Sequence, residues 1–295
     1  MESNKELIEL LISVDSLKFD AEEPFTWASG YNMPVYCDFR KLYTLPNHRR
    51  FLINLLADKV ENSNILIGVP NSGIALASFL SVNTRAINGI FGNRTVYVLK
   101  EVIKADVASS IDSVVAVAPY GIPIGCHIAA KLELPFFYYR ERKSHGMKKT
   151  LEGNPSVNIS NPLIVSPTYL PPNLEGLFER YELFIFKTED FFEELKSGNR
   201  RITVVEDVIS TGNSLLEITK LIRETGFILH KILAAFTYDF EKTNTTLEQN
   251  NCPVYCGLRF PEVLSYLASN KLLPDHVLST LHSWYESPFT WRCKE

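Results

Sequence analysis

Apolar runs of strand length alternate with segments of helical periodicity along most of this chain of 295 residues. The runs occupy residues 65–69, 95–99, 114–118, 135–139, 202–205 and 232–236. Apolar residues recur at helical spacing in residues 49–59, from residue 74, in 126–132 and in 215–222. Strands that alternate with helices predict an α/β fold with a mainly parallel sheet flanked by helices.

The two ends of the chain carry a different pattern. The N-terminus predicts an amphipathic helix whose apolar face holds Leu7, Leu10, Leu11 and Val14. Residues 34–40 are expected to form an edge strand that starts with its proline. After the last strand, residues 257–291 predict a helix, a turn near Pro274 and a second helix.

One strand, turn and helix unit occurs twice. Residues 64–80 (NILIGVPNSGIALASFL) and 113–129 (SVVAVAPYGIPIGCHIA) align without a gap through their turns. We interpret the two copies as a duplication, because a solenoid would need at least three.

Composition limits the partners of the protein. The net charge of −4 gives no field that would attract nucleic acid. The 5 cysteines are an odd number scattered along the chain, which indicates reduced thiols in a cytosolic protein. The spacing of Cys252 and Cys256 would suit a metal, but no second pair accompanies them. No apolar run is long enough to span a membrane, and the acidic N-terminal helix is unlike a targeting peptide.

The most informative stretch is residues 200–226. A buried strand at 202–205 is followed by Glu206 and Asp207, then by a small polar turn and a helix that stops at Gly226. Unpaired N–H groups at the start of such a helix bind phosphate. Carboxylates beside a phosphate need sugar hydroxyls or a divalent cation as partners. The stretch therefore predicts a phosphorylated sugar as ligand, although an ordinary capped turn has the same outline.

Residues 204–214 (VVEDVISTGNS) resemble the phosphoribosyl-pyrophosphate motif of type I phosphoribosyltransferases. The resemblance implies that Glu206 and Asp207 hold the ribose hydroxyls and that the turn holds the 5′-phosphate. The motif residues expected to bind phosphoribosyl pyrophosphate are Glu206, Asp207, Val208, Ile209, Ser210, Thr211, Gly212, Asn213 and Ser214. The turn lacks the glycine spacing and the lysine of a nucleoside-triphosphate loop.

The N-terminal region resembles one branch of that family, the orotate phosphoribosyltransferases. The resemblance rests on residues 24–30 (PFTWASG) and 34–41 (PVYCDFRK). It implies a hood over the base in which Tyr36 and Cys37 flank the pyrimidine, with Ser210 also near it. Asn32 and Met33 stand where many members have Lys-Ser. Taken alone, the aromatic residues of this region fit core packing equally well.

Residues 138–153 hold a basic segment in an acidic protein. Lys143-Ser144-His145-Gly146 resembles the end of the flexible loop of orotate phosphoribosyltransferases, although the loop is one residue shorter between Arg140 and Lys143. The resemblance implies that Arg140, Arg142, Lys143 and His145 bind phosphoribosyl pyrophosphate, and that Arg140, Lys143, His145 and Asp207 are catalytic. Cations over the leaving pyrophosphate would stabilise its charge in the transition state. A generic charge run would instead be a solvated face.

The family has one turn that receives pyrophosphate through backbone N–H groups, and the duplication offers two candidates. We assign it to the second copy, at Pro119, Tyr120 and Gly121, and treat residues 84–112 as an insertion. The first copy, at residues 70–73, stays open as the alternative. A second insertion at residues 154–199 is interpreted as a surface decoration with a helix-like part at 189–196. A cap over the active site and a surface for association are the alternatives.

The resemblance covers both ends of the chain and its central motifs. It implies a single phosphoribosyltransferase domain over residues 1–295, with a hood at 1–45, a core at 46–250 and a C-terminal helical tail at 251–295. It further implies transfer of ribose 5-phosphate to orotate, Mg²⁺ carried by phosphoribosyl pyrophosphate rather than by a protein site, and a cytoplasmic homodimer. The alternatives are an enzyme for another nucleobase, a non-catalytic regulator that binds the phosphosugar, and an α/β protein for some other phosphorylated metabolite.

Overall fold

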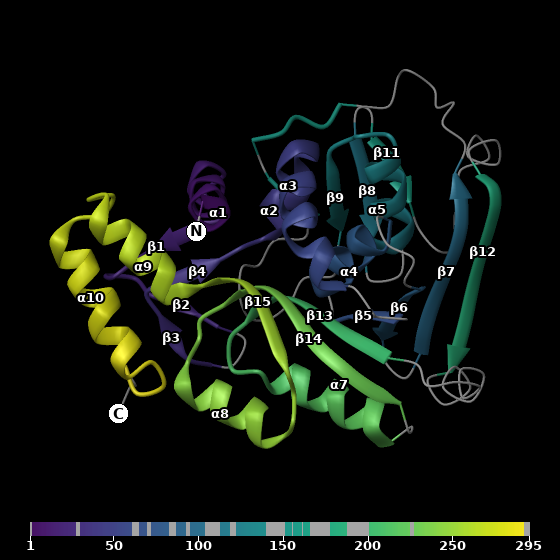
Figure 1. The fold of residues 1–295 in the computed structure, drawn as a ribbon. Helices are drawn as coiled ribbons and strands as arrows, with labels where there is room; N and C mark the ends of the chain where they lie inside the picture. The colour runs from purple at the N-terminus through teal and green to yellow at the C-terminus, as the bar shows by residue number, and fades with distance from the viewer. Residues whose placement is uncertain are drawn as a thin grey trace.

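The computed structural model describes residues 2–27, 30–60, 65–69, 72–82, 87–92, 95–103, 113–118, 122–139, 151–154, 156–160, 162–165, 178–187, 201–224 and 227–291. A sheet of 7 strands runs through the molecule in the order β12-β7-β6-β5-β13-β14-β15 (Figure 1). All neighbours from β6 to β15 are parallel, and only β7 and β12 run antiparallel to their neighbours. This confirms the expected mainly parallel α/β fold. The strands are β5 Ile65–Gly68, β6 Ile87–Gly92, β7 Thr95–Ile103, β12 Phe178–Lys187, β13 Arg201–Ile209, β14 Ile228–Thr237 and β15 Val254–Arg259.

The two copies of the duplicated strand-turn-helix unit lie in two different sheets, and each is followed by a further parallel strand. The first copy is β5 and α4 (Ser72–Val82), followed by β6, in the main sheet. The second is β8 (Ser113–Val117) and α5 (Ile122–Lys131), followed by β9 (Phe136–Tyr139), in a sheet of 4 strands, ordered β10-β9-β8-β11. The helices α4 and α5 pack against each other, so that they join the two sheets (Figure 1).

The described parts of both insertions extend the sheets. The first insertion supplies β6 and β7. The second supplies β11 (Pro162–Val165), which pairs with β8, and β12, which pairs along β7. The described residues of the second insertion thus add one edge strand to each sheet through their backbone groups. Its interpretation as a surface decoration stays a prediction. The helix-like part predicted at 189–196 lies outside the described residues.

The N-terminal region forms two small antiparallel pairs beside the main sheet. Helix α1 (Glu2–Ser13) buries Leu7 and Leu11 as predicted, and it buries Ile8 as well, whereas the predicted Leu10 is only half-buried. Strand β1 (Leu17–Phe19) pairs with β4 (Val35–Cys37), and β2 (Phe25–Thr26) pairs with β3 (Asn32–Met33). The predicted strand at 34–40 is shorter than expected, because the chain turns into α2 (Arg40–Thr44). Helix α3 (Pro46–Ala57) and the 3₁₀ turn η1 (Asp58–Val60) follow.

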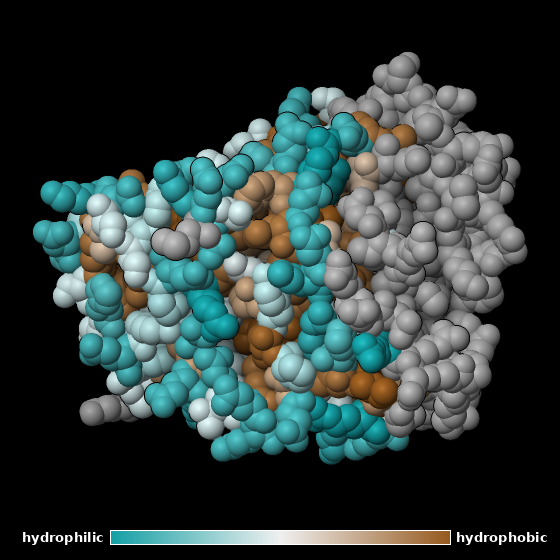
Figure 2. Space-filling model, in the orientation of Figure 1, coloured by the Kyte–Doolittle hydropathy of each residue, from teal (hydrophilic) through white to brown (hydrophobic). Residues whose placement is uncertain are grey.

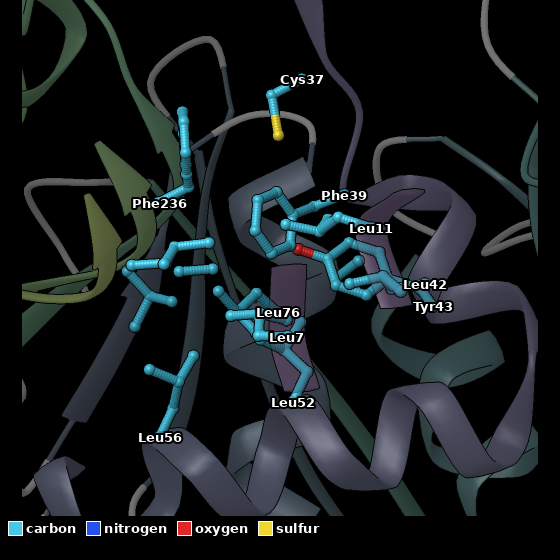
Figure 3. Packing of buried hydrophobic residues seen from close by; sticks show 14 of the residues in the cluster. Leu7, Leu11, Cys37, Phe39, Leu42, Tyr43, Leu52, Leu56, Leu76 and Phe236 are labelled. Carbon is cyan, nitrogen blue, oxygen red and sulfur yellow. The ribbon is translucent and has the colours of Figure 1, made fainter. Parts of the chain in front are cut away.

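One continuous apolar core joins this region to the sheets. Leu7 and Leu11 of α1 meet Phe39 and Tyr43 around α2, and they share the core with Phe236 of β14 (Figure 3). Hydrophilic side chains cover most of the described part of the face seen in Figure 2, with apolar side chains coming to the surface mainly in its middle.

Arg49 of α3 stabilises the junction of three helices. Its guanidinium donates hydrogen bonds to the backbone oxygens of Tyr43 (2.9 Å), Ala129 (2.9 Å) and Leu134 (3.2 Å). These oxygens lie at or just beyond the carboxyl ends of α2 and α5, where helices leave carbonyl groups without intrahelical partners. Burial lowers the pKa of Arg49 to about 10. Its cation thus caps two helices at once.

The C-terminal tail packs on the hood, with a helix on each side of the turn at Pro274 as predicted. Helix α8 (Glu241–Gln249) precedes β15, and α9 (Phe260–Ser269) and α10 (Asp275–Glu286) follow it. Trp284 of α10 is fully buried, and its indole N–H donates to the sulfur of Met33 in the hood at 2.9 Å. Its ring meets those of Tyr238 and Phe240 edge to face at 6.0 and 5.7 Å. Aromatic burial of this kind fixes the hood against the end of β14.

Candidate active site

A tight turn lies at the carboxyl edge of the main sheet, after β13. Helix α7 (Asn213–Glu224) starts there, and its first turn forms through the bond from the Leu216 N–H to the Gly212 oxygen (3.1 Å). Gly212 has a φ of +76°, a conformation that favours glycine. The Thr243 hydroxyl of α8 donates to the Ser210 oxygen at 2.9 Å and holds the turn from outside. The predicted strand, turn and helix are confirmed, and the first N–H groups of α7 are available to an anion.

The two acids lie in β13 itself rather than after it. The predicted strand end at residue 205 was too early, because β14 continues to pair with β13 as far as Ile209 opposite Thr237. Glu206 and Asp207 are half-buried, and the Asp207 N–H donates to Glu206 Oε1 at 3.1 Å. Burial, and then the neighbouring Asp207, raise the pKa of Glu206 well above its usual range. The pair therefore favours one neutral and one charged carboxyl.

The first copy of the duplicated unit meets β13 at this edge. Strand β5 pairs with β13, and the Val69 N–H donates to the Val205 oxygen at 2.9 Å. Gly73, in the first turn of α4, lies so close that a Cβ there would be 2.5 Å from the Val205 oxygen and 3.2 Å from Glu206 Oε1. Strand β8 of the second copy belongs to the other sheet. Pro119, Tyr120 and Gly121, which follow β8, lie outside the described residues.

The charge of Asp207 reaches the hood strand β4. Burial raises the pKa of Tyr36 to about 12, with Arg40 acting against this and Asp38 and Asp207 adding to it. Burial, and then Asp38 and Asp207, also raise the pKa of Cys37 well above its usual range. Asp207 thus acts electrostatically on both hood residues that the sequence singled out.

The basic segment begins and ends at one place. Strand β10 (Leu151–Glu152) pairs antiparallel with β9, and Leu151 lies opposite Tyr139. Residues 140–150 connect these two strands, and Arg140, Arg142, Lys143 and His145 lie among them, outside the described residues.

Sequence reasoning missed one polar cluster beside the hood. The Arg40 guanidinium donates to Asp38 and to the Tyr36 hydroxyl (3.1 Å), and it forms an ion pair with Glu152 (2.9 Å). The Asp-x-Arg spacing directly after a strand was a signal for the near half of this cluster. No local pattern predicted that Glu152 would join the cluster, because Glu152 follows the basic segment and is distant from Arg40 in the sequence.

Within the described ranges, no group of three or more His, Cys, Asp or Glu side chains could hold a metal ion. In the same residues, no helix is long and apolar enough to cross a membrane. Cys252 is buried with its sulfur 3.6 Å from the Thr219 hydroxyl, and Cys256 lies near the backbone oxygen of Leu258.

Comparison with known proteins agrees with this geometry. The profile of the phosphoribosyl transferase domain matches residues 98–256, which is more than half of the chain and includes β13, its acids and the turn. The chain belongs to the phosphoribosyl transferase domain family.

Relatives of this phosphoribosyltransferase align over nearly their full length. An orotate phosphoribosyltransferase of Cytophaga hutchinsonii is 24% identical over 293 residues, which are 99% of this chain and 100% of that protein. One of Bacteroides thetaiotaomicron is 26% identical over 284 residues, or 96% and 94% of the two chains. Among solved structures, the orotate phosphoribosyltransferase of Francisella tularensis is 14% identical with a TM-score of 0.44, covering 95% of this chain and 98% of that one.

Proposed function

We propose that this phosphoribosyltransferase transfers ribose 5-phosphate from phosphoribosyl pyrophosphate to orotate, giving orotidine 5′-phosphate and pyrophosphate in pyrimidine nucleotide biosynthesis. The observation that carries the proposal is the end of β13, where Glu206 and Asp207 precede the turn and the N-terminus of α7. Tyr36 and Cys37 of the hood strand β4 lie close enough for the charge of Asp207 to act on both. A base held by the hood would then adjoin a ribose held by β13. The names and near-complete coverage of the curated relatives support orotate as that base.

The described groups suit a displacement that asks for little covalent chemistry. The N–H groups of α7 and the residues from Ser210 to Ser214 would hold the 5′-phosphate. Asp207 and Glu206 would accept hydrogen bonds from, or donate them to, the ribose hydroxyls. As the bond to pyrophosphate lengthens, positive charge develops on the ribose, and the carboxylate of Asp207 would stabilise it. Positioning and charge account for the catalysis in this scheme.

The pyrophosphate would lie at the same sheet edge. The sequence favoured Pro119, Tyr120 and Gly121, and the pairing of β5 with β13 supports the alternative turn before α4. Mg²⁺ carried by phosphoribosyl pyrophosphate would neutralise charge on the leaving group, and Asp207 offers the kind of oxygen ligand that Mg²⁺ prefers.

We also propose a cytoplasmic homodimer. The described cysteines Cys37, Cys126, Cys252 and Cys256 are free thiols, which suits a reducing compartment. The exposed side chains of Tyr139 and Leu151, opposite each other in β9 and β10, would favour burial against a second copy.

The proposal is tested by the loss of orotate absorbance with phosphoribosyl pyrophosphate and Mg²⁺. We expect turnover that stops when Mg²⁺ is chelated and that does not occur with uracil in place of orotate. Tight binding of phosphoribosyl pyrophosphate without turnover would support a regulator instead. Turnover only with another nucleobase would keep the family activity and contradict the choice of orotate.

Lys143→Ala is expected to lower kcat by about 100-fold while changing the Kd of phosphoribosyl pyrophosphate much less. The reason is that a cation over the leaving group gains most when charge develops in the transition state. Steady-state kinetics and calorimetric titration give the two quantities. Lys148→Ala makes the same change of charge in the same segment and serves as the control. Equal losses in kcat and in binding would contradict the role of Lys143.

A further inference from the structure

The cluster around Arg40 is nearly closed to solvent. The side chains of Arg40, Asp38 and Glu152 are 10%, 4% and 2% exposed. Among the described contacts, the guanidinium of Arg40 faces two carboxylates, so its charge is already paired within the cluster. Burying charged side chains costs solvation free energy, which their mutual attraction only partly offsets. Stabilisation of the fold is therefore a poor explanation for this cluster.

The cluster joins three segments that are distant in the sequence. Tyr36 belongs to β4, Arg40 begins α2, and Glu152 lies in β10 directly after the basic segment. The other end of α2 is held to the same segment, because the Asn154 N–H donates to the Thr44 hydroxyl at 2.8 Å. Helix α2 is therefore tied at both ends to residues 152–154, and the hood strand is tied to α2 through Arg40.

The contact with Tyr36 fixes the direction of its hydroxyl group. A guanidinium has donors only, so the Tyr36 oxygen accepts from Arg40 at 3.1 Å. A phenol has one proton to donate, and with Arg40 on the oxygen this proton must point elsewhere. Burial raises the pKa of Tyr36 to about 12, with Arg40 acting against this and nearby carboxylates adding to it, so that the proton stays on the phenol. Tyr36 is thus a donor whose orientation is set by Arg40.

We propose that Arg40 is a positioning residue that holds the Tyr36 hydroxyl as a hydrogen-bond donor to an oxygen acceptor of the nucleobase. This inference rests on the proposed function, in which the base lies between the hood and a ribose at Asp207. Orotate has two ring carbonyls and a carboxylate, all of them acceptors. A donor that cannot turn to become an acceptor favours such a base over one that presents an amino group.

The test compares single and double variants in the orotate assay. Tyr36→Phe removes the donor and leaves the ion cluster intact, and we expect the KM for orotate to rise about tenfold or more, as for the loss of one hydrogen bond to a charged acceptor. The KM for phosphoribosyl pyrophosphate should change much less. Arg40→Lys keeps the charge but loses the planar fork, and it should shift the KM for orotate in the same direction.

The double variant distinguishes positioning from a merely structural role. If Arg40 acts through Tyr36, Tyr36→Phe with Arg40→Lys raises the KM for orotate no more than Tyr36→Phe alone. Lys41→Met is the matched control: Lys41 is the next residue of α2, is also buried, and pairs with Asp15 at 2.9 Å. It should lower the melting temperature without changing either KM.

Three outcomes would overturn the inference. An unchanged KM for orotate in Tyr36→Phe would show that the Tyr36 hydroxyl does not bind the base. If the two substitutions multiply their effects on the KM in the double variant, Arg40 does not act through Tyr36. Absence of orotate turnover in the wild-type protein overturns the proposed function and the inference together, which distinguishes it from the other two. Tyr36→Phe still decides the question if Arg40→Lys does not fold.

Discussion

Asp207→Asn is expected to lower kcat/KM for the proposed transfer by about 100-fold or more. The substitution keeps the size of the side chain but removes the charge that would stabilise the developing positive charge on the ribose. Glu206→Gln should lower it by less than about tenfold, because Gln resembles the neutral form that burial beside Asp207 already favours in Glu206. Steady-state kinetics on both variants measures the difference. Equal losses would contradict the division of roles between the two acids.

The same pair has a predicted effect on stability. The pKa of folded Glu206 is raised above the usual 4.5, so the folded protein keeps a proton that the unfolded chain releases. Stability from this group is therefore fully present below pH 4.5 and is lost as the pH rises towards the folded pKa. Glu206→Gln has no such titration. Urea unfolding at about pH 5 and about pH 8 measures the free energy of unfolding of both proteins. The value for Glu206→Gln minus that for wild type should be larger at the higher pH. The same difference at both pH values would contradict this prediction.

Gly73→Ala is expected to lower the free energy of unfolding by about 3 kcal/mol. The added Cβ would lie 2.5 Å from the Val205 oxygen and 3.3 Å from the Glu206 Cα. Both neighbours are backbone atoms of β13 in the middle of the main sheet, so the clash cannot be relieved by turning a flexible side chain. Helix α4 or β13 must shift, and the acids would move with β13. Urea unfolding measures the loss, and kinetics should show a parallel fall in activity.

Gly30→Ala provides the comparison for Gly73→Ala. Gly30 has a φ of +86° but no atom within 4 Å of an added Cβ. Its substitution should cost only the conformational strain of about 1 kcal/mol. Similar losses in the two variants would show that crowding at β13 is not the cause.

The strand, turn and helix proposed to bind phosphate could be predicted as a structure from the sequence, because their causes are local. The β-branched run, the acids, Gly212 and the helical spacing after it lie within one short stretch, and each constrains the next few residues. The two copies of the duplicated unit were visible for the same reason. The end of β13 was not, since its last residues are held in the strand by β14 rather than by their own propensity.

Contacts between distant segments needed the tertiary structure. Nothing near Arg40 indicates that Glu152 completes its cluster, and nothing near residues 178–187 indicates that they pair with β7. The choice of which duplicated turn lies beside the acids also depends on contacts between distant segments. Both turns have suitable residues, but only sheet order decides that β5, and not β8, lies beside β13.

The sequence by itself determined the α/β class and the strand-turn-helix with its two acids, because each depends on side chains close together in the chain. The tertiary structure decided which strand adjoins the acids, what the insertions form and how the hood meets Asp207. The physical reason is that strand pairing and buried ion pairs join groups whose separation in the sequence carries no information about their distance in space.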